Sequence, residues 1–107
     1  MANRLAQAGP RMSVVSGGAM WPPHEVSLTT NPKEVPTPSG TPAAGDRLTV
    51  FLTEDEDGGN SITWASGYDA GTQTDINTDG GVISIFDFIA KSDSKWYQIG
   101  PFRTVEP

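Results

Sequence analysis

The sequence contains no cysteine, only one histidine and no long apolar run, and each absence removes a class of structure. Without cysteine, the chain has no disulfides and no thiolate metal sites. No stretch of about 18 or more apolar residues occurs, so we expect no membrane insertion. Residues 1–20 include Arg4 and Arg11 but no continuous apolar core, and they lack the pattern of a signal peptide.

Positive charge is also scarce. Seven lysines and arginines stand against thirteen acidic residues, which gives a formal net charge of −6. Because nucleic-acid binding requires clustered Lys and Arg to neutralise phosphates, we expect no nucleic-acid partner. Hydrophobic residues make up only 36% of the chain. A small domain of this composition has a thin core, and we expect neighbouring subunits to add stability.

The signatures of catalysis are missing as well. His24 lies beside two prolines and has no evident carboxylate partner, which makes it a poor general base. The sequence contains no nucleophile elbow, P-loop, dinucleotide fingerprint or zinc-binding histidine pair. We therefore expect a protein that is not an enzyme and that uses no cofactor.

The first part of the chain is rich in proline, with seven of the nine prolines before residue 46. Proline removes a backbone donor, so helices and central strands are excluded from most of this part. We divide the chain into an extended N-terminal arm, residues 1–24, and a β domain, residues 25–107. The arm is too apolar for a purely solvated tail, and our hypothesis is that it docks onto another chain, the alternative being a partly disordered terminus. The candidate docking residues are Leu5, Met12, Val14, Val15, Met20 and Trp21.

The remainder of the chain has the pattern of short β-strands. Alternating apolar residues and turn residues predict strands at 25–30, 47–53, 61–65, 81–90 and 95–100. Residues 31–46 are expected to be an irregular connection with polyproline character. Strands at this spacing predict an all-β domain, a small antiparallel β-sandwich or barrel-like fold without helices.

Two of these strands are apolar on both faces. Val50 and Phe51 point to opposite faces of one strand, and Ile85 and Phe86 point to opposite faces of another. Such strands need cover on both faces, which either a subunit interface or a second small core within one chain would supply. The first alternative predicts a homotrimer or another closed ring.

Two acidic stretches have the oxygen-rich composition that suits Ca²⁺. Residues 54–60 (EDEDGGN) do not have the ligand spacing of a calcium loop. Acidic residues before Gly-Gly instead predict a hairpin turn between strands. The stretch DINTDGG places Asp75, Asn77 and Asp79 at the first, third and fifth positions of a calcium loop, but Phe86 occupies the closing position. We favour a glycine turn that enters a strand, with no bound metal.

Two segments, GDRLTVFLTEDEDGGNSITWASGY (45–68) and GVISIFDFIAKSDSKWYQIG (81–100), resemble a β-domain common in tailed-bacteriophage structural proteins. The shared features are an Arg-Leu-Thr-aliphatic strand, a polar turn that ends in Gly-Gly and an apolar-Thr-Trp strand. An aliphatic-aromatic strand and a Trp-Tyr strand follow. With the preceding strand and connector, the resemblance covers about 80 residues. The connector ASGYDAGTQTDINTD departs from the family, because it is shorter and more acidic than usual.

The resemblance implies a virion structural protein, made in the host bacterial cytoplasm and often trimeric. The function that we favour is a minor tail or tail-tip component that docks onto other virion proteins through its N-terminal arm. A capsid (head) decoration protein is one alternative, and a β module that binds a host surface or carbohydrate is another. For binding to a host surface, Tyr68 in a turn is the residue expected to be exposed, whereas Trp64 and Trp96 are expected in the core.

Overall fold

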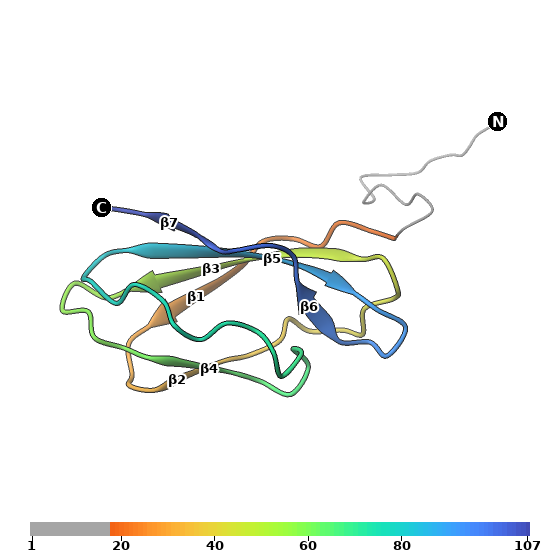
Figure 1. Ribbon diagram of the computed structural model, residues 1–107, viewed down its shortest axis with the longest axis horizontal. Helices are drawn as coiled ribbons and strands as arrows, with labels where there is room; N and C mark the ends of the chain where they lie inside the picture. The colour runs from red at the N-terminus through yellow and green to blue at the C-terminus, as the bar shows by residue number, and fades with distance from the viewer. Residues whose placement is uncertain (1–17) are drawn as a thin grey trace.

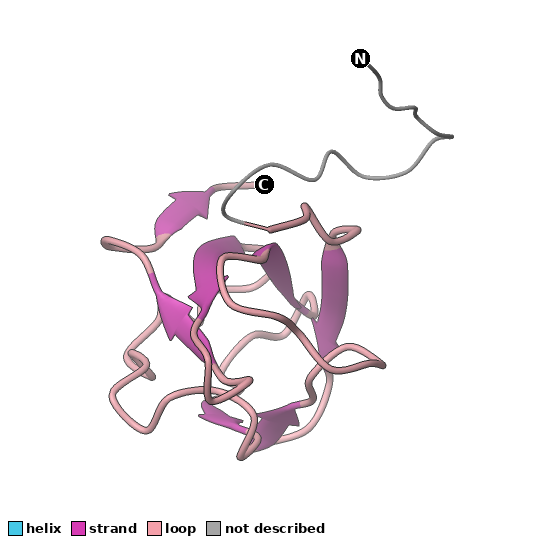
Figure 2. Ribbon diagram, turned by 90° about the vertical axis from the view of Figure 1, so that its right-hand side faces the viewer, coloured by secondary structure: helices cyan, strands magenta, loops and turns pink. Residues whose placement is uncertain are grey.

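Seven strands make up the regular structure of the computed structural model, which describes residues 18–107 (Figure 1). The described residues contain strands, turns and loops but no helix, which confirms the all-β class (Figure 2). Five strands form one sheet in the order β1-β3-β5-β6, with β7 also paired to β5, and β2 and β4 form a second sheet. The bounds are β1 His24–Leu28, β2 Lys33–Val35, β3 Arg47–Glu54, β4 Ile62–Trp64, β5 Ile83–Ala90, β6 Trp96–Gln98 and β7 Arg103–Val105.

The buried core lies between the two sheets, with β3 and β5 as its main contributors. Successive side chains of a strand point to opposite faces, so every second residue of these two strands is buried. Val35 of β2 and Ile62 of β4 meet this face from the other sheet. The residues of the large sheet in this core are Val26, Leu28, Leu48, Val50, Leu52, Phe86, Phe88, Ala90 and Trp96.

Aromatic contacts compensate for the small number of apolar residues. The ring of Trp64 lies 4.7 Å from that of Tyr68, 4.9 Å from Phe86 and 5.4 Å from Phe88, all in edge-to-face geometry. Such pairs stabilise by about 0.5–1.5 kcal/mol beyond the area that they bury. Trp96 is 1% exposed and lies in the core as predicted. Trp64 is half-buried and packs against the same cluster from outside.

The strand directions differ from the expected antiparallel arrangement. β3–β5, β5–β6 and β5–β7 are antiparallel, but β1 pairs with β3 and β2 pairs with β4 in parallel. Parallel pairing needs a long crossover connection. The chain supplies one by passing through β2 of the small sheet between β1 and β3. The large sheet is therefore mixed and the small sheet parallel, rather than antiparallel throughout.

Two strands were absent from the prediction. β2 lies within the stretch expected to be irregular, and Pro32 and Pro36 flank its three residues. Its sheet has only two strands, so β2 is an edge strand, where proline is tolerated. β7 has only three residues, and all of them are exposed. It therefore lacks the alternation of buried and exposed residues by which a strand is predicted. The expected first strand, 25–30, is observed as β1, which begins one residue earlier and ends at Leu28.

A tight turn is present within residues 54–60, where the Gly58 amide donates to the Asp55 carbonyl (3.2 Å). The predicted hairpin is wrong, because β3 and β4 belong to different sheets. These residues instead cross between the sheets and pack against the loop before β5. The Gly59 amide donates to the Thr78 carbonyl (2.7 Å), and the Gly81 amide donates to the Asp55 carbonyl (3.0 Å). A Cβ atom at Gly80 would overlap the Glu56 carbonyl, so glycine permits this contact. The expected glycine turn into a strand is confirmed at Gly81, just before β5.

The two faces of β3 and β5 should respond differently to truncation. We expect Phe86→Ala to lower the free energy of unfolding by about 3–5 kcal/mol, because Phe86 is fully buried among aromatic rings. Phe51→Ala, on the half-buried opposite face, should lower the free energy of unfolding by less than about 2 kcal/mol. Urea denaturation at low protein concentration measures both, and equal losses would show that the two faces do not differ.

Candidate protein-interaction site

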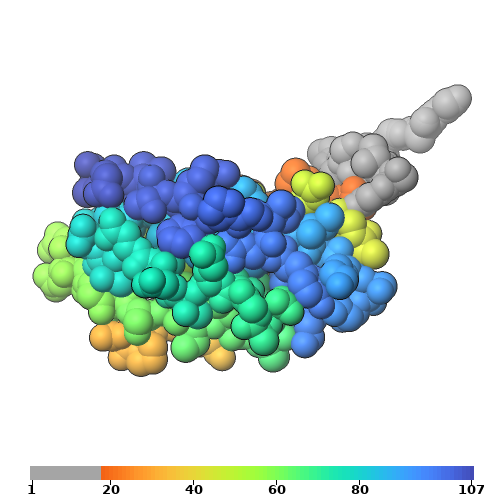
Figure 3. All heavy atoms as spheres, in the orientation of Figure 1, coloured from red at the N-terminus to blue at the C-terminus, as the bar shows by residue number. Residues whose placement is uncertain are grey.

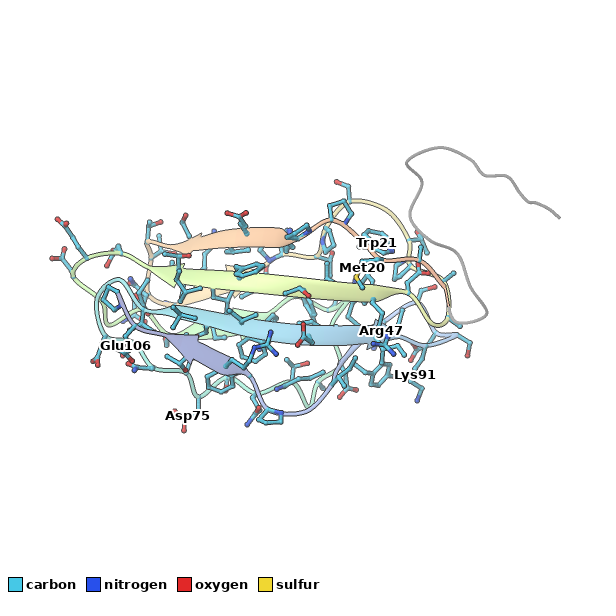
Figure 4. All side chains as sticks on the ribbon, turned by 90° about the horizontal axis from the view of Figure 1, so that it is seen from above. Met20, Trp21, Arg47, Asp75, Lys91 and Glu106 are labelled. Atoms are coloured by element: carbon cyan, nitrogen blue, oxygen red, sulfur yellow. The ribbon has the colours of Figure 1, made fainter. Side chains whose placement is uncertain are left out.

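The outer face of the five-stranded sheet, the side turned away from β2 and β4, carries several apolar residues that are not fully buried. No second layer covers it in Figure 1, and Figure 4 looks onto it. The alternation that buries one side of β3 and β5 places Phe51, Ile83, Ile85 and Ile89 on the other side, where each is half-buried.

Strand register gathers four of the outer-face residues into one patch. Phe51 of β3 is paired with Ile85 of β5, and Ile83 is paired with Val105 of β7. Val105 is 46% exposed, so the patch reaches the edge of the sheet. We call Phe51, Ile83, Ile85 and Val105 the outer patch. Contiguous apolar residues of this kind mark protein contacts more often than isolated ones do.

A polar group borders the outer patch, with Asp87 two residues beyond Ile85 on the same face of β5. The Asp87 carboxylate accepts a hydrogen bond from the Thr49 hydroxyl (2.9 Å) and forms an ion pair with Arg103 (3.0 Å). The side chain of Arg103 is 61% exposed, so this ion pair adds little stability. The ion pair orients the Arg103 side chain beside the apolar residues, and β7 itself is paired with β5.

A second apolar group lies at the end of the sheet where the described chain begins. Met20 is 55% exposed and Ile99 is 40% exposed. Together with Arg47, Thr49 and Asp87 they line a cavity of about 170 Å³. A cavity of roughly this size holds a benzene-sized apolar group. Figure 4 shows Met20, Trp21 and Arg47 close together at this end.

The buried carboxylate of Asp46 fixes the start of the described chain to the β domain. Its oxygens accept hydrogen bonds from the Ala19 amide (2.8 Å), the Ala43 amide (2.9 Å) and the Trp21 indole (2.9 Å). Burial alone would raise the pKa of Asp46, but the hydrogen bonds from Ala19, Ala43 and Trp21 lower it below its ordinary value. We call this set of contacts the Asp46 clamp.

Backbone pairing and close packing support the Asp46 clamp. The Arg47 amide donates to the Ala19 carbonyl (2.8 Å), and the Trp21 amide donates to the Arg47 carbonyl (2.9 Å). Gly18 has a φ of 100°, and a Cβ atom there would lie 2.5 Å from the Asp46 amide nitrogen. Figure 3 shows the orange start of the described chain packed against the yellow loop before β3.

The arm residues named from the sequence fall into two groups. Leu5, Met12, Val14 and Val15 lie outside the described residues. Met20 is exposed as a docking residue should be. Trp21 instead packs against the core, with its ring 5.3 Å from that of Trp96.

The expected boundary after residue 24 is also shifted. Residues 18–23 are held by the Asp46 clamp, and His24 already belongs to β1. The His24 ring nitrogen Nε2 lies 2.8 Å from the Pro36 carbonyl oxygen, in a contact that helps to join the two sheets.

The exposure predicted for Tyr68 is wrong. Tyr68 is 3% exposed, its ring packs against Trp64 and Phe88, and its hydroxyl donates to the Pro36 carbonyl (2.9 Å). Burial raises the pKa of Tyr68. Its turn position predicted exposure, but a turn that closes over a core can direct an aromatic side chain inward.

The structure gives no support to the calcium candidate. The side-chain oxygen of Asn77 accepts from the Asp79 amide (2.9 Å), and its side-chain nitrogen faces Glu106 (3.4 Å). Within residues 18–107, no three His, Asp or Glu side chains gather in a way that could hold a metal ion. The loop geometry is instead explained by hydrogen bonds to its own backbone.

Two residues of the site were missed by sequence reasoning, Asp46 and Asp87. Asp46 stands alone between a Pro/Gly-rich connection and a strand, and its partners Ala19 and Trp21 lie 27 and 25 positions away. Asp87 is the one acidic residue within the apolar run ISIFDFIA, and that interruption was the available signal for a polar contact on the outer face.

Comparison of the chain with protein-family models, with curated proteins and with solved structures found no match. In the part of the chain that the structure describes, no helix is long and apolar enough to cross a membrane.

The Asp46 clamp predicts a specific pH dependence. The pKa of Asp46 is lower in the folded chain, so its charge stabilises the fold above about pH 4, and this contribution is lost as the pH falls through the folded-state pKa. We expect Asp46→Asn to cost about 1–3 kcal/mol of unfolding free energy at pH 7, and less as the pH approaches 3. Denaturation of both proteins between pH 7 and 3 measures this difference.

Asp93→Asn is the matched control for this measurement. A hydrogen bond from Tyr97 lowers the pKa of Asp93 as well, but the Asp93 side chain is exposed, so its loss should change stability little. A difference between wild type and Asp46→Asn that stays constant with pH would contradict the role given to the Asp46 charge.

Proposed function

We propose that this protein is a virion structural subunit of a tailed bacteriophage, a minor tail or tail-tip component that assembles through protein–protein contacts. The observation that carries the proposal is the outer patch, an apolar surface on the same two strands that form the core. In an acidic chain with a net charge of −6, such a surface is better explained by a partner than by solvent.

The outer face has the composition of an interface. Its apolar part contains Phe51, Ile83 and Ile85. Arg103 and Asp87 lie beside them, and Glu25 is paired with Phe51 from the edge strand. An apolar centre with polar residues at its margin is the usual anatomy of a protein–protein interface. Burial of this centre would add roughly 25 cal/mol for each Å² removed from water.

The phage assignment rests on the sequence resemblance, and the fold is compatible with it. In the proposal the two sheets form a small β-sandwich, and copies of the chain form a closed ring, such as a trimer, in which neighbours cover the outer faces. The N-terminal arm attaches the subunit to other virion proteins. A capsid decoration protein would use the same surfaces, and its place in the virion would differ.

A host-surface or carbohydrate-binding module is a second candidate, supported by a different cavity. Trp64, Asp69 and Lys95 contribute to the wall of a cavity of about 340 Å³ among the loops next to β4. A half-buried tryptophan beside polar side chains is a combination that suits a sugar ring. The indole nitrogen of Trp64 already donates to the Gln73 carbonyl (2.7 Å), so only the ring surface would be available.

Assembly through the outer face can be tested by the mass of the protein in solution. We expect the wild-type chain to form an oligomer, and Ile85→Asp, at the centre of the outer patch, to weaken association by at least about tenfold, because it places a charge in an apolar interface. Thr63→Asp is the matched control, since Thr63 is an exposed strand residue of the small sheet. Light scattering across a concentration series gives the masses. A monomeric wild type, or equal effects of the two variants, would contradict the proposal.

Membership of a virion is tested on particles. We expect peptides of this chain in purified particles released by cells that carry its coding sequence, and we expect a variant without residues 1–17 to be lost from those particles. Quantitative mass spectrometry measures both, with an established virion protein as the reference. Particles that lack the chain would contradict the virion role, and full incorporation of the shortened variant would contradict docking by the arm.

A further inference from the structure

The segment outside the described residues and the β domain carry opposite charge. All thirteen acidic residues lie in residues 18–107, whereas residues 1–17 contain Arg4 and Arg11 and no acidic residue. Arg11 directly precedes the apolar residues of the sequence MSVV. A basic residue followed by apolar ones is the complement of an apolar surface with acidic surroundings.

The outer patch has such surroundings. It lies toward the end of the sheet from which β3 leaves and at which β5 begins. Exposed carboxylates in the loops of this end and after β7 include Glu56, Asp57, Asp79 and Glu106. The opposite end, where the described chain starts, carries Arg47, Lys91 and Lys95 with one exposed carboxylate, Asp93, between the lysines. Figure 4 shows Arg47 and Lys91 there, far from Glu106.

The length of the chain decides whose outer patch the segment can cover. Met20 is paired with Arg47, and Phe51 lies four residues further along β3. Gly18 is therefore roughly 20 Å from Phe51 at about 3.3 Å per residue. Val14 and Val15 precede Gly18 by only four and three residues, so they reach at most roughly 14 Å from it. These valines fall short of the outer patch of their own chain. Met12, six residues before Gly18, reaches roughly 20 Å and so at most its near edge.

From these observations we propose that residues 11–16 of one copy lie on the outer patch of a second copy. Met12, Val14 and Val15 contact Phe51, Ile83, Ile85 and Val105, and the arginines of the segment face the acidic end of the second copy. The inference rests on the proposed assembly role and names, for residues 11–16 of the arm, one of the virion proteins that it contacts: another copy of this chain. The Asp46 clamp fixes the point from which each segment departs.

Disulfide trapping tests this contact cleanly, because the natural chain has no cysteine. Val14→Cys is mixed under mild oxidation with Thr53→Cys, an exposed residue paired with Ile83 at the margin of the outer patch. Thr63→Cys, an exposed threonine of the small sheet, is the matched control. One protein of each mixture is labelled with ¹⁵N, so that mass spectrometry identifies mixed dimers. Circular dichroism verifies that each variant is folded.

We expect mixed dimers with Thr53→Cys to exceed those with Thr63→Cys severalfold, and the excess to fall at high salt or when Arg4 and Arg11 are replaced by Gln. The double variant Val14→Cys/Thr53→Cys should form links between chains. Equal yields with the two threonine positions, or links only within one chain, would overturn the inference. Either result would leave the virion role standing if the chain is found in particles, whereas absence from particles would remove that role whatever the trapping shows.

Discussion

The Asp46 clamp is the contact on which the order of the large sheet depends. A buried carboxylate is costly unless donors surround it, and here two amides and an indole supply them. The backbone of Asp46 adds a link to the end of β5, because its carbonyl accepts from the Ala90 amide (2.9 Å). One residue therefore joins the entering chain, the start of β3 and the end of β5. Between the Met20–Arg47 bridge and β1 the pairing then shifts by one residue, so that His24 lies opposite Val50.

The sequence was sufficient for the strands with strong alternation but not for their pairing. β3 and β5 were found because every second residue is apolar, and that signal is local. Pairing depends on contacts between distant residues, and residues 54–60 illustrate the difference. Their glycines satisfy the local rule for a hairpin, yet their backbone partners are Thr78 and Gly81 in another loop. Asp46 was overlooked for the same reason, because nothing near it in the chain indicates the partners at positions 19 and 21.

The two apolar faces of β3 and β5 were predicted, but the sequence did not say which one is the core. The structure places the phenylalanines of β5 inside, where Trp64 and Phe102 offer ring contacts, and the isoleucines outside. Rings gain from neighbouring rings in a way that isoleucine does not, which accounts for this choice. Tyr68 follows the same rule. Its position in a turn favoured exposure, but the aromatic cluster and the carbonyl of Pro36 provide partners for both its ring and its hydroxyl.

In the proposed assembly, folding and association would be coupled, because β3 and β5 carry both the core and the outer face. A partner on the outer patch removes apolar surface from water and, in the same step, holds the two central strands together. Any molecule that binds only the folded chain stabilises it by mass action. The core alone is modest, as expected for a small domain with few apolar residues. Under this proposal the half-buried isoleucines of the outer face would stabilise the fold further once a partner covers them.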